Sequence, residues 1–466
     1  MYGLDDAPAE WRATVSDFTV KDLKAERNVV EPCWYSIFEP KTRRLLGQIL
    51  VEVDDFIIAA LPEHYDKLQK QMQDRFTFGK WEVNEAEFAG RHIRCTPEAI
   101  YIDQHKYIQE QVHPIALPKG RRQQAKEPVS DDEFTALRSL IYRINWVGRE
   151  TRPEAAGLAS IMASKLKHAK VEDILLVNKF VNYLRSTSDR AIKIWAFDPR
   201  EMAFVVFSDA GGINTKGSDL LDEEGLPTDS TQGAWLVLAT EKLPHGRQKV
   251  RATPLAWRSS KLKRKVFSTY GGETQSMLQG VSEVDWLQVM YRDATAHDVA
   301  LSNWRCSLSP HMLVMKGDCE LGGRQQQCSV TDAKSLYDCL LRENPSGKQD
   351  RKSALELAIV LRDLQETKSM VRWVPHQKML VDGLTKEDPL KASDALHQFL
   401  KSGVLSLVDV TSELECRKSD PLYRRRSNQA SRERLLSEYR ENYLQFLTPL
   451  VNIVWGDCHE TPLDTM

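Results

Sequence analysis

Four acidic residues in the second half of the chain stand where a predicted strand ends or a predicted helix begins. Asp209 follows the apolar run FVVFS, Asp332 follows QCSV, and Asp382 follows MVRWVPHQKMLV. Glu273 stands near the start of a long helical pattern. In an α/β scaffold, such positions face one shared crevice. Because four crowded carboxylates would repel one another strongly, the pattern favours a site that binds cations.

The cations that suit this set are divalent and hard. Mg²⁺ prefers oxygen ligands, and two such ions about 4 Å apart activate an attacking water and stabilise the leaving oxygen of a phosphodiester. The sequence therefore predicts a site for two Mg²⁺ ions, with Mn²⁺ as a substitute, and cleavage of a nucleic acid. Any one of these acids alone is more often a solvated residue or a helix cap, so the prediction depends on their combination and order.

The elements that must position these acids follow from the spacing of apolar residues. Three strands are predicted first, over 203–212, 232–240 and 253–260. After them come a helix over 271–290, a strand running into a helix over 326–341, a helix over 353–365, a strand over 370–375 and a helix over 393–400. Three strands followed by alternating helices and strands predict an α/β domain.

The first half of the chain has a different pattern of apolar residues. Residues 45–60 predict two strands around a tight turn at Asp54 and Asp55, and a helix follows over 63–76. Residues 78–95 and 99–108 alternate like short strands. A polar, proline-containing linker over 118–133 precedes three helical stripes, which are Leu137 to Ile144, Leu158 to Met162 and Ile174 to Leu184.

Composition narrows the class of protein. The chain has 466 residues, of which 41% are hydrophobic and 28% charged, and its net charge is −2. These values exclude a wholly disordered chain and a membrane bundle, and any nucleic-acid binding must use local patches. The sequence shows no secretory signal and no apolar run of about 18 residues. The eight cysteines form no CxxC pair. We therefore expect an intracellular protein, cytoplasmic or nuclear, without membrane contact.

The second half resembles the RNase H domain of Copia-type (Pseudoviridae-like) retrotransposons. The resemblance is carried by FSDAGG, by the helix that begins near Glu273 and contains Trp286, by VTDAKSLYD and by VDGLTK. It implies an RNase H-like mixed five-stranded sheet flanked by helices, with Asp209, Glu273, Asp332 and Asp382 as the catalytic metal ligands. It also implies Mg²⁺-dependent cleavage of the RNA strand of an RNA–DNA hybrid.

Two features depart from the family pattern or extend it. Insertions over 217–231 and 303–327 are predicted surface loops. His376 precedes the last acid in VPHQKMLVD; related retroviral domains have a loop histidine there that aids product release, although the spacing here is shorter. The resemblance makes His376 a candidate catalytic residue, and a plain surface histidine is the alternative.

The first half resembles the reverse transcriptase of the same elements. The matching segments, in order, are YGLDDAPAEW, LVEVDD, FAGRHI, DQHKYI, SLIYRINWVGRETRP and NKFVNYLRSTSD. The resemblance makes Asp54 and Asp55 a remnant of the polymerase hairpin, with Glu52 in place of the family's tyrosine. The second polymerase aspartate belongs to a motif upstream of Tyr2, so we expect this chain to lack polymerase activity.

Taken together, the patterns and the resemblance predict five parts and an α/β and α+β fold. These are a truncated reverse-transcriptase palm (1–117), a linker (118–134), a helical thumb or connection subdomain (135–196), an RNase H-like domain (197–400) and a C-terminal extension, partly helical or disordered (401–466). The chain would thus be a fragment of a retrotransposon Pol polyprotein.

One basic cluster is the preferred nucleic-acid contact. Lys261, Lys263, Arg264 and Lys265 lie between the third predicted strand of the RNase H part and the Glu273 helix, so they are within reach of a hybrid in the active crevice. The expected partners are an RNA–DNA hybrid, template and primer nucleic acid, and other proteins encoded by the element.

Two other functions stay open. The protein is an RNA-directed DNA polymerase if it extends upstream, or else a catalytically inactive relic that binds nucleic acid. An integrase domain shares the topology, but its third carboxylate is a glutamate on a late helix, so the fourth aspartate in VDGLTK argues against it.

Overall fold

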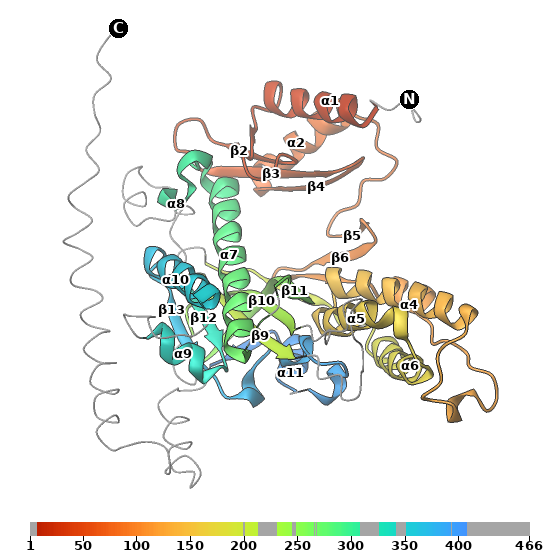
Figure 1. Cartoon of the computed structure of the whole chain (residues 1–466). Coiled ribbons are helices and arrows are strands. Elements are labelled where there is room, and N and C mark those ends of the chain that lie inside the picture. The colour runs from red at the N-terminus through yellow and green to blue at the C-terminus, as the bar shows by residue number, and fades with distance from the viewer. Residues whose placement is uncertain are drawn as a thin grey trace. The chain divides into compact units, whose positions relative to one another are not determined.

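The computed structural model describes residues 7–198, 201–212, 231–244, 248–264, 266, 268–307, 326–341, 351–392 and 394–407. Of these, residues 7–340 and 351–407 belong to one compact unit (Figure 1). Most of both predicted insertions, the extension beyond residue 407 and Lys265 lie outside the described residues. In the described part of the chain, no helix is both long enough and apolar enough to cross a lipid bilayer.

The second half builds a mixed sheet in the order β13-β12-β9-β10-β11-β14. Its strands are β9 (Ala203–Gly212), β10 (Thr231–Thr240), β11 (Lys249–Lys261), β12 (Gln326–Thr331), β13 (Met370–Trp373) and β14 (Val404–Ser406). The first three strands are antiparallel, whereas β12 runs parallel to β9 and β13 parallel to β12. This arrangement is the predicted RNase H-like mixed sheet, and it confirms the fold class.

The prediction of five strands was one strand short. Beyond the final predicted helix, Gly403 adopts a left-handed φ of +65°, and the next residues return to the sheet as β14. There β14 pairs with β11 between Lys249 and Arg251. The missed strand is only three residues long, so it has no periodicity from which to predict it.

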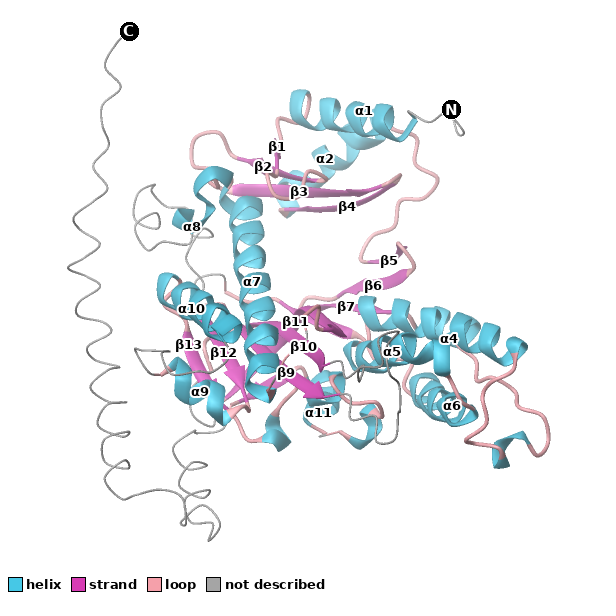
Figure 2. Cartoon of the chain, viewed as in Figure 1, coloured by secondary structure: helices cyan, strands magenta, loops and turns pink. Residues whose placement is uncertain are grey.

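Helices flank this sheet (Figure 2). They are α7 (Thr269–Ala296), α9 (Lys334–Leu340), α10 (Arg351–Glu366) and α11 (Ala395–Ser402). The short helix α8 (Trp304–Ser307) contacts α7. Residues along β9 alternate between two cores, as strand geometry requires. Val205 and Phe207 pack in the core that includes α11, whereas Phe204 and Val206 pack against α7.

The N-terminal part holds the predicted hairpin. Helices α1 (Ala7–Lys21) and α2 (Pro62–Arg75) accompany a sheet in the order β1-β2-β3-β4. Its strands are β1 (Glu26–Arg27), β2 (Trp34–Phe38), β3 (Leu45–Glu52) and β4 (Asp55–Ala60). Glu52 pairs with Asp55, so Val53 and Asp54 form the turn, and Val53 has a left-handed φ of +56°. The strand–turn–strand prediction over 45–60 is confirmed, but the turn lies one residue earlier than predicted, because Asp55 already belongs to β4.

The rest of the predicted palm contributes three strands to a separate sheet, and the fourth strand comes from the end of the predicted connection subdomain. The sheet contains β5 (Glu85–Phe88), β6 (Arg91–Cys95), β7 (Ala99–Asp103) and β8 (Ile192–Trp195), in that order. The prediction of strand over 99–108 was wrong after Asp103, because α3 (His105–Gln111) begins there. Asp103 Oδ1 accepts a hydrogen bond from the backbone N–H of His105 at 2.9 Å, which supports the start of the helix.

The three predicted helices are α4 (Asp131–Glu150), α5 (Pro153–Lys165) and α6 (Val171–Ser186). Their predicted apolar stripes share one core. Helix α4 begins inside the predicted linker, where Ser130 and Glu133 form a capping box. Arg121 also pairs with Glu133, so the loop before α4 is tied to the helix. The five domain boundaries stay predictions.

Candidate metal centre

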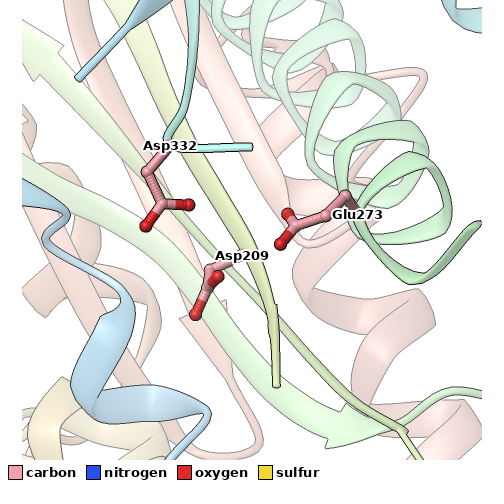
Figure 3. Close-up of side chains that lie close together, drawn as sticks. All are labelled: Asp209, Glu273 and Asp332. Atoms are coloured by element: carbon pink, nitrogen blue, oxygen red, sulfur yellow. The ribbon is translucent and has the colours of Figure 1, made fainter. Parts of the chain in front are cut away.

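Three of the four predicted acids lie together at one end of the mixed sheet. Asp209 belongs to β9, Asp332 directly follows β12, and Glu273 belongs to α7. One carboxylate oxygen from each lies within 4.8 Å of those of the other two, and the side chains point toward one another (Figure 3). The register explains the pairing, because Phe207 lies opposite Val330 on the parallel neighbour. Asp209 and Asp332 each come two residues later, so they reach the same level.

Asp209 is buried and fixed from the side of the last motif. Thr385 Oγ1 donates a hydrogen bond of 2.6 Å to Asp209 Oδ2. Burial, followed by the charge of Asp332, raises the pKa of Asp209 to about 6, although the Thr385 hydrogen bond and the Lys386 charge oppose the shift. The site therefore disfavours a negative charge on Asp209 when no cation is bound.

Glu273 is held over the sheet by close packing of α7. Ser268 caps the helix by accepting a hydrogen bond from the backbone N–H of Gly271. A Cβ on Gly272 would lie 3.2 Å from that of Ala210 on β9, so the glycine permits the close approach. One turn further on, Ser276 Oγ donates to the carbonyl oxygens of Asp209 and Ala234, at 2.8 and 2.7 Å.

The pKa of Glu273 is raised by the same kinds of cause as the pKa of Asp209. Burial, followed by the charges of Asp209 and Asp332, raises the pKa of Glu273 well above its usual range. Its Oε2 atom is buried and has no hydrogen-bond partner among the described residues. A buried carboxylate oxygen beside two other carboxylates is a suitable ligand for a hard divalent cation.

The fourth acid, Asp382, is not among these three. It begins the short 3₁₀ helix η6 (Asp382–Leu384) and is almost fully buried. His376 connects it to the group, with Nδ1 at 2.9 Å from Asp332 Oδ2 and Nε2 at 3.3 Å from Asp382 Oδ1. Lys386 Nζ lies 3.4 Å from the same Asp382 oxygen. Thus His376 and Asp382 border the site, and their roles in binding metal and releasing product stay predictions.

The loop after Asp382 is held by the helical part of the chain, which consists of α4, α5 and α6. A Cβ on Gly157 of α5 would lie 2.6 Å from the carbonyl oxygen of Leu384, so the helix and the loop are in backbone contact. Lys165 pairs with Glu387, and Lys179 Nζ lies 2.9 Å from Asp388 Oδ2. Sequence reasoning missed these contacts. It also missed Thr385 and Lys386, although both belong to the motif VDGLTK.

The polymerase-like hairpin is not part of this site. Asp54 and Asp55 are exposed, and neither belongs to a cluster of possible metal ligands in the described ranges. Two segments of the reverse-transcriptase resemblance do meet there, because Trp11 Nε1 donates to the carbonyl oxygen of Val53 at 2.5 Å. Glu52 is at the place of the family's tyrosine, and its Oε2 atom lies 3.5 Å from the Nη2 atom of Arg91.

The predicted basic cluster divides into two kinds of residue. Lys261 ends β11, and Lys261 and Lys263 are exposed between that strand and α7, where the sequence predicted them. Arg264 instead pairs with Glu356 of α10. Nucleic-acid binding by this cluster stays a prediction, and its described exposed cations are Lys261 and Lys263.

No protein family matches the chain, and no curated protein does. Among solved structures, the N-terminal RNase H domain of Rv2228c from Mycobacterium tuberculosis, fused to maltose-binding protein, has 13% identity and a TM-score of 0.22, over 43% of this chain and 99% of that one. The foamy viral protease–reverse transcriptase with an RNA/DNA hybrid has 13% identity and a TM-score of 0.39, over 80% of this chain and 38% of that one.

The same foamy viral protein in complex with double-stranded DNA has 14% identity and a TM-score of 0.40, over 80% of this chain and 59% of that one. The matches therefore take in about half of the viral chain. At these scores the likenesses carry no argument for function, and the fold class follows from the strand order and the strand directions.

Proposed function

We propose that the protein is a metal-dependent nuclease of the RNase H type that cleaves the RNA strand of RNA–DNA hybrids. The observation that supports this proposal best is the meeting of Asp209, Glu273 and Asp332 within 4.8 Å at the end of the mixed sheet. Three sequence-distant acids converge there, although burial and the neighbouring carboxylates raise the pKa of Asp209 and of Glu273. Such an arrangement is expected where a bound cation offsets the repulsion.

The donor set fits Mg²⁺, because all of its ligand atoms are carboxylate oxygens and Glu273 Oε2 is buried without a partner among the described residues. Asp209, Glu273 and Asp332 would hold the metal, with Asp382 beside them. When bound, Mg²⁺ supplies acidification of an attacking water and neutralisation of the leaving 3′ oxygen, which gives products with 5′-phosphate ends.

The chain's own residues prepare the site for that chemistry. Thr385 orients Asp209 through its hydrogen bond, and the packing of α7 on β9 fixes the height of Glu273. His376 spans Asp332 and Asp382 and remains half-exposed to solvent. From that position it is suited to bind a product phosphate as it leaves, which is the role that the family resemblance implies.

The retrotransposon origin belongs to the same proposal. We take residues 1–117 as a remnant of a Copia-type reverse transcriptase, because the hairpin with Asp54 and Asp55 is present and packs with Trp11 of the first matching segment. Polymerase activity of a longer protein and an inactive relic are the alternatives. The relic predicts that the acids no longer support cleavage, so a cleavage assay separates it from the nuclease.

The deciding experiment uses a labelled RNA strand, annealed to DNA or to RNA, with Mg²⁺ or EDTA. We expect cleavage of the hybrid in Mg²⁺ only. Asp209→Asn and Glu273→Gln keep the side-chain shapes but remove the charges, so each should abolish cleavage. Asp54→Asn, on the exposed hairpin, is the matched control and should cleave like the wild type. An intact hybrid with the wild-type protein would favour the relic, and normal cleavage by Asp209→Asn would refute the site.

A further inference from the structure

Lys386 is a cation at the border of the acidic site, and the nuclease chemistry described above does not use it. It lines a depression of about 480 Å³ next to the three carboxylates. The residues that line this depression are His376, Gln377, Asp382, Lys386, Glu387, Asp388, Lys391 and Ala392. Because Asp382 and His376 belong to this lining, the depression opens directly beside the proposed metal centre.

The ammonium group of Lys386 faces both the acids and the solvent. Its Nζ lies 3.4 Å from Asp382 Oδ1, yet 45% of the side chain is exposed. Its positive charge also acts on Asp209, where it opposes the rise of the pKa. A flexible side chain with three hydrogen-bond donors in this position can therefore turn from the carboxylates to a ligand in the depression.

The backbone that carries Lys386 is fixed while its head group is exposed. The preceding residue, Thr385, is hydrogen-bonded to Asp209. The following residues, Glu387 and Asp388, pair with Lys165 and Lys179 of the helical part. The residues on both sides of Lys386 thus anchor the loop. His376 Nε2 also lies 3.3 Å from Asp382 Oδ1, so Lys386 is not the only polar neighbour of Asp382.

We propose that Lys386 is a substrate-positioning residue that binds a backbone phosphate of the hybrid, next to the bond that is cut. The proposal rests on the proposed nuclease function and names a contact within it. A phosphate that approaches three carboxylates meets repulsion, so a cation on the open side of the site assists its entry. A bound cation would also compete for Asp382 and release the ammonium for the phosphate, with which it forms a charge-assisted hydrogen bond.

The test compares Lys386→Gln and Lys386→Arg with Lys391→Ala. Lys391 lines the same depression and is 79% exposed, but it pairs with Asp388 rather than with Asp382. The first measurement is hybrid affinity against salt concentration, with each change made in the non-cleaving Asp209→Asn background. We expect Lys386→Gln to make the log–log salt slope shallower by about one unit, as when one phosphate is no longer neutralised. Lys386→Arg should retain the slope.

The second measurement gives kcat and KM separately for the Lys386 variants that keep Asp209 and can therefore cleave. We expect Lys386→Gln to lower kcat/KM about ten- to a hundred-fold, the loss typical of a hydrogen bond to a charged group. Calorimetric titration with Mg²⁺ alone should give an unchanged or tighter affinity, because the competitor for Asp382 is gone. A purely structural lysine predicts the reverse, with weaker Mg²⁺ binding and an unchanged salt slope, and that result would overturn the proposal.

Two further outcomes are decisive. An equal change of slope in Lys391→Ala would show a general surface charge and would refute a specific contact of Lys386. If the wild-type protein cleaves no hybrid, the proposed function fails, and the salt slope still decides whether Lys386 binds phosphate. Failure of the positioning role and failure of the nuclease are therefore distinguishable.

Discussion

The hydroxyl of Thr385 donates a 2.6 Å hydrogen bond to Asp209 and joins the last motif of the site to its first strand. The backbone makes the same connection, because a Cβ on Gly211 would lie 2.7 Å from the carbonyl oxygen of Thr385. Only a residue without a side chain permits so close a crossing. The position of Asp209 therefore depends on a loop that lies far away in sequence.

The first prediction concerns the stability of the metal-free protein. Asp209 has a pKa of about 6 in the folded protein, so it keeps its proton to a higher pH in the folded state than in the unfolded state. The folded state consequently loses stability as the pH rises from about 4 through 6, by up to about 3 kcal/mol. Asp209→Asn carries no such charge. We expect it to raise the free energy of unfolding in EDTA at about pH 7.5, although it abolishes cleavage.

The measurement is denaturant unfolding in EDTA between about pH 4 and pH 8, for the wild type and the variant. The gain should shrink as the pH falls toward about 4, because the wild-type carboxyl then begins to bind a proton in the unfolded state as well. Asp54→Asn removes an exposed carboxylate and should change little at any pH. A stabilisation by Asp209→Asn that does not depend on pH would contradict the electrostatic explanation.

The sequence contained enough to predict that the acids meet. Alternation along FVVFS identifies a strand, and an acid at the end of each of two parallel neighbours must reach the same edge. The observed pairing of Phe207 with Val330 gives this result. Glu273 was predictable from its place at the start of a long helix. The height of that helix above the sheet was not, because it depends on Gly272 and its contact with Ala210.

Contacts between charged residues could not be predicted in the same way. Lys179 and Asp388 have no periodic pattern that distinguishes them from solvated surface residues, yet they form an ion pair. The helix that begins at His105 was not predicted, and the reason is local. The apolar residues up to Ile108 continue the alternation of a strand, whereas the Asp103 side chain supports the start of a helix.

The second prediction tests the backbone contact between α5 and the loop after Asp382. Gly157→Ala would put a Cβ 2.6 Å from the carbonyl oxygen of Leu384, and backbone on both sides leaves little freedom to relax. We expect the free energy of unfolding to fall by about 1–3 kcal/mol. Cleavage should fall as well, because the loop positions Thr385. Gly79→Ala, where nothing lies within 4 Å, is the control and should be neutral in both assays.

The third prediction tests the ion pair between Lys179 and Asp388. Asp388 is mostly buried and Lys179 half-exposed, so the pair should be stronger than an ordinary surface salt bridge. We expect Lys179→Asp to lower the single-turnover cleavage rate several-fold, because two like charges push the loop away from the helix. The double variant Lys179→Asp with Asp388→Lys restores opposite charges and should recover much of the rate. No recovery would mean that the pair does not position the loop.

The last prediction concerns the exposed lysines at the end of β11. Lys261 and Lys263 lie between the end of β11 and the start of α7, and we expect a hybrid in the acidic site to pass near them. Each lysine that binds a phosphate displaces counterions, so the double variant Lys261→Ala with Lys263→Ala should weaken hybrid binding. It should also make the salt slope shallower by about one unit for each phosphate that is no longer bound.

The matched control is Lys67→Ala with Lys70→Ala on α2, which removes the same charge from positions outside this region. Arg264→Ala should instead destabilise the fold, since it breaks the pair with Glu356. An equal fall in affinity in the α2 control would reduce the effect to net charge and would refute a local binding patch.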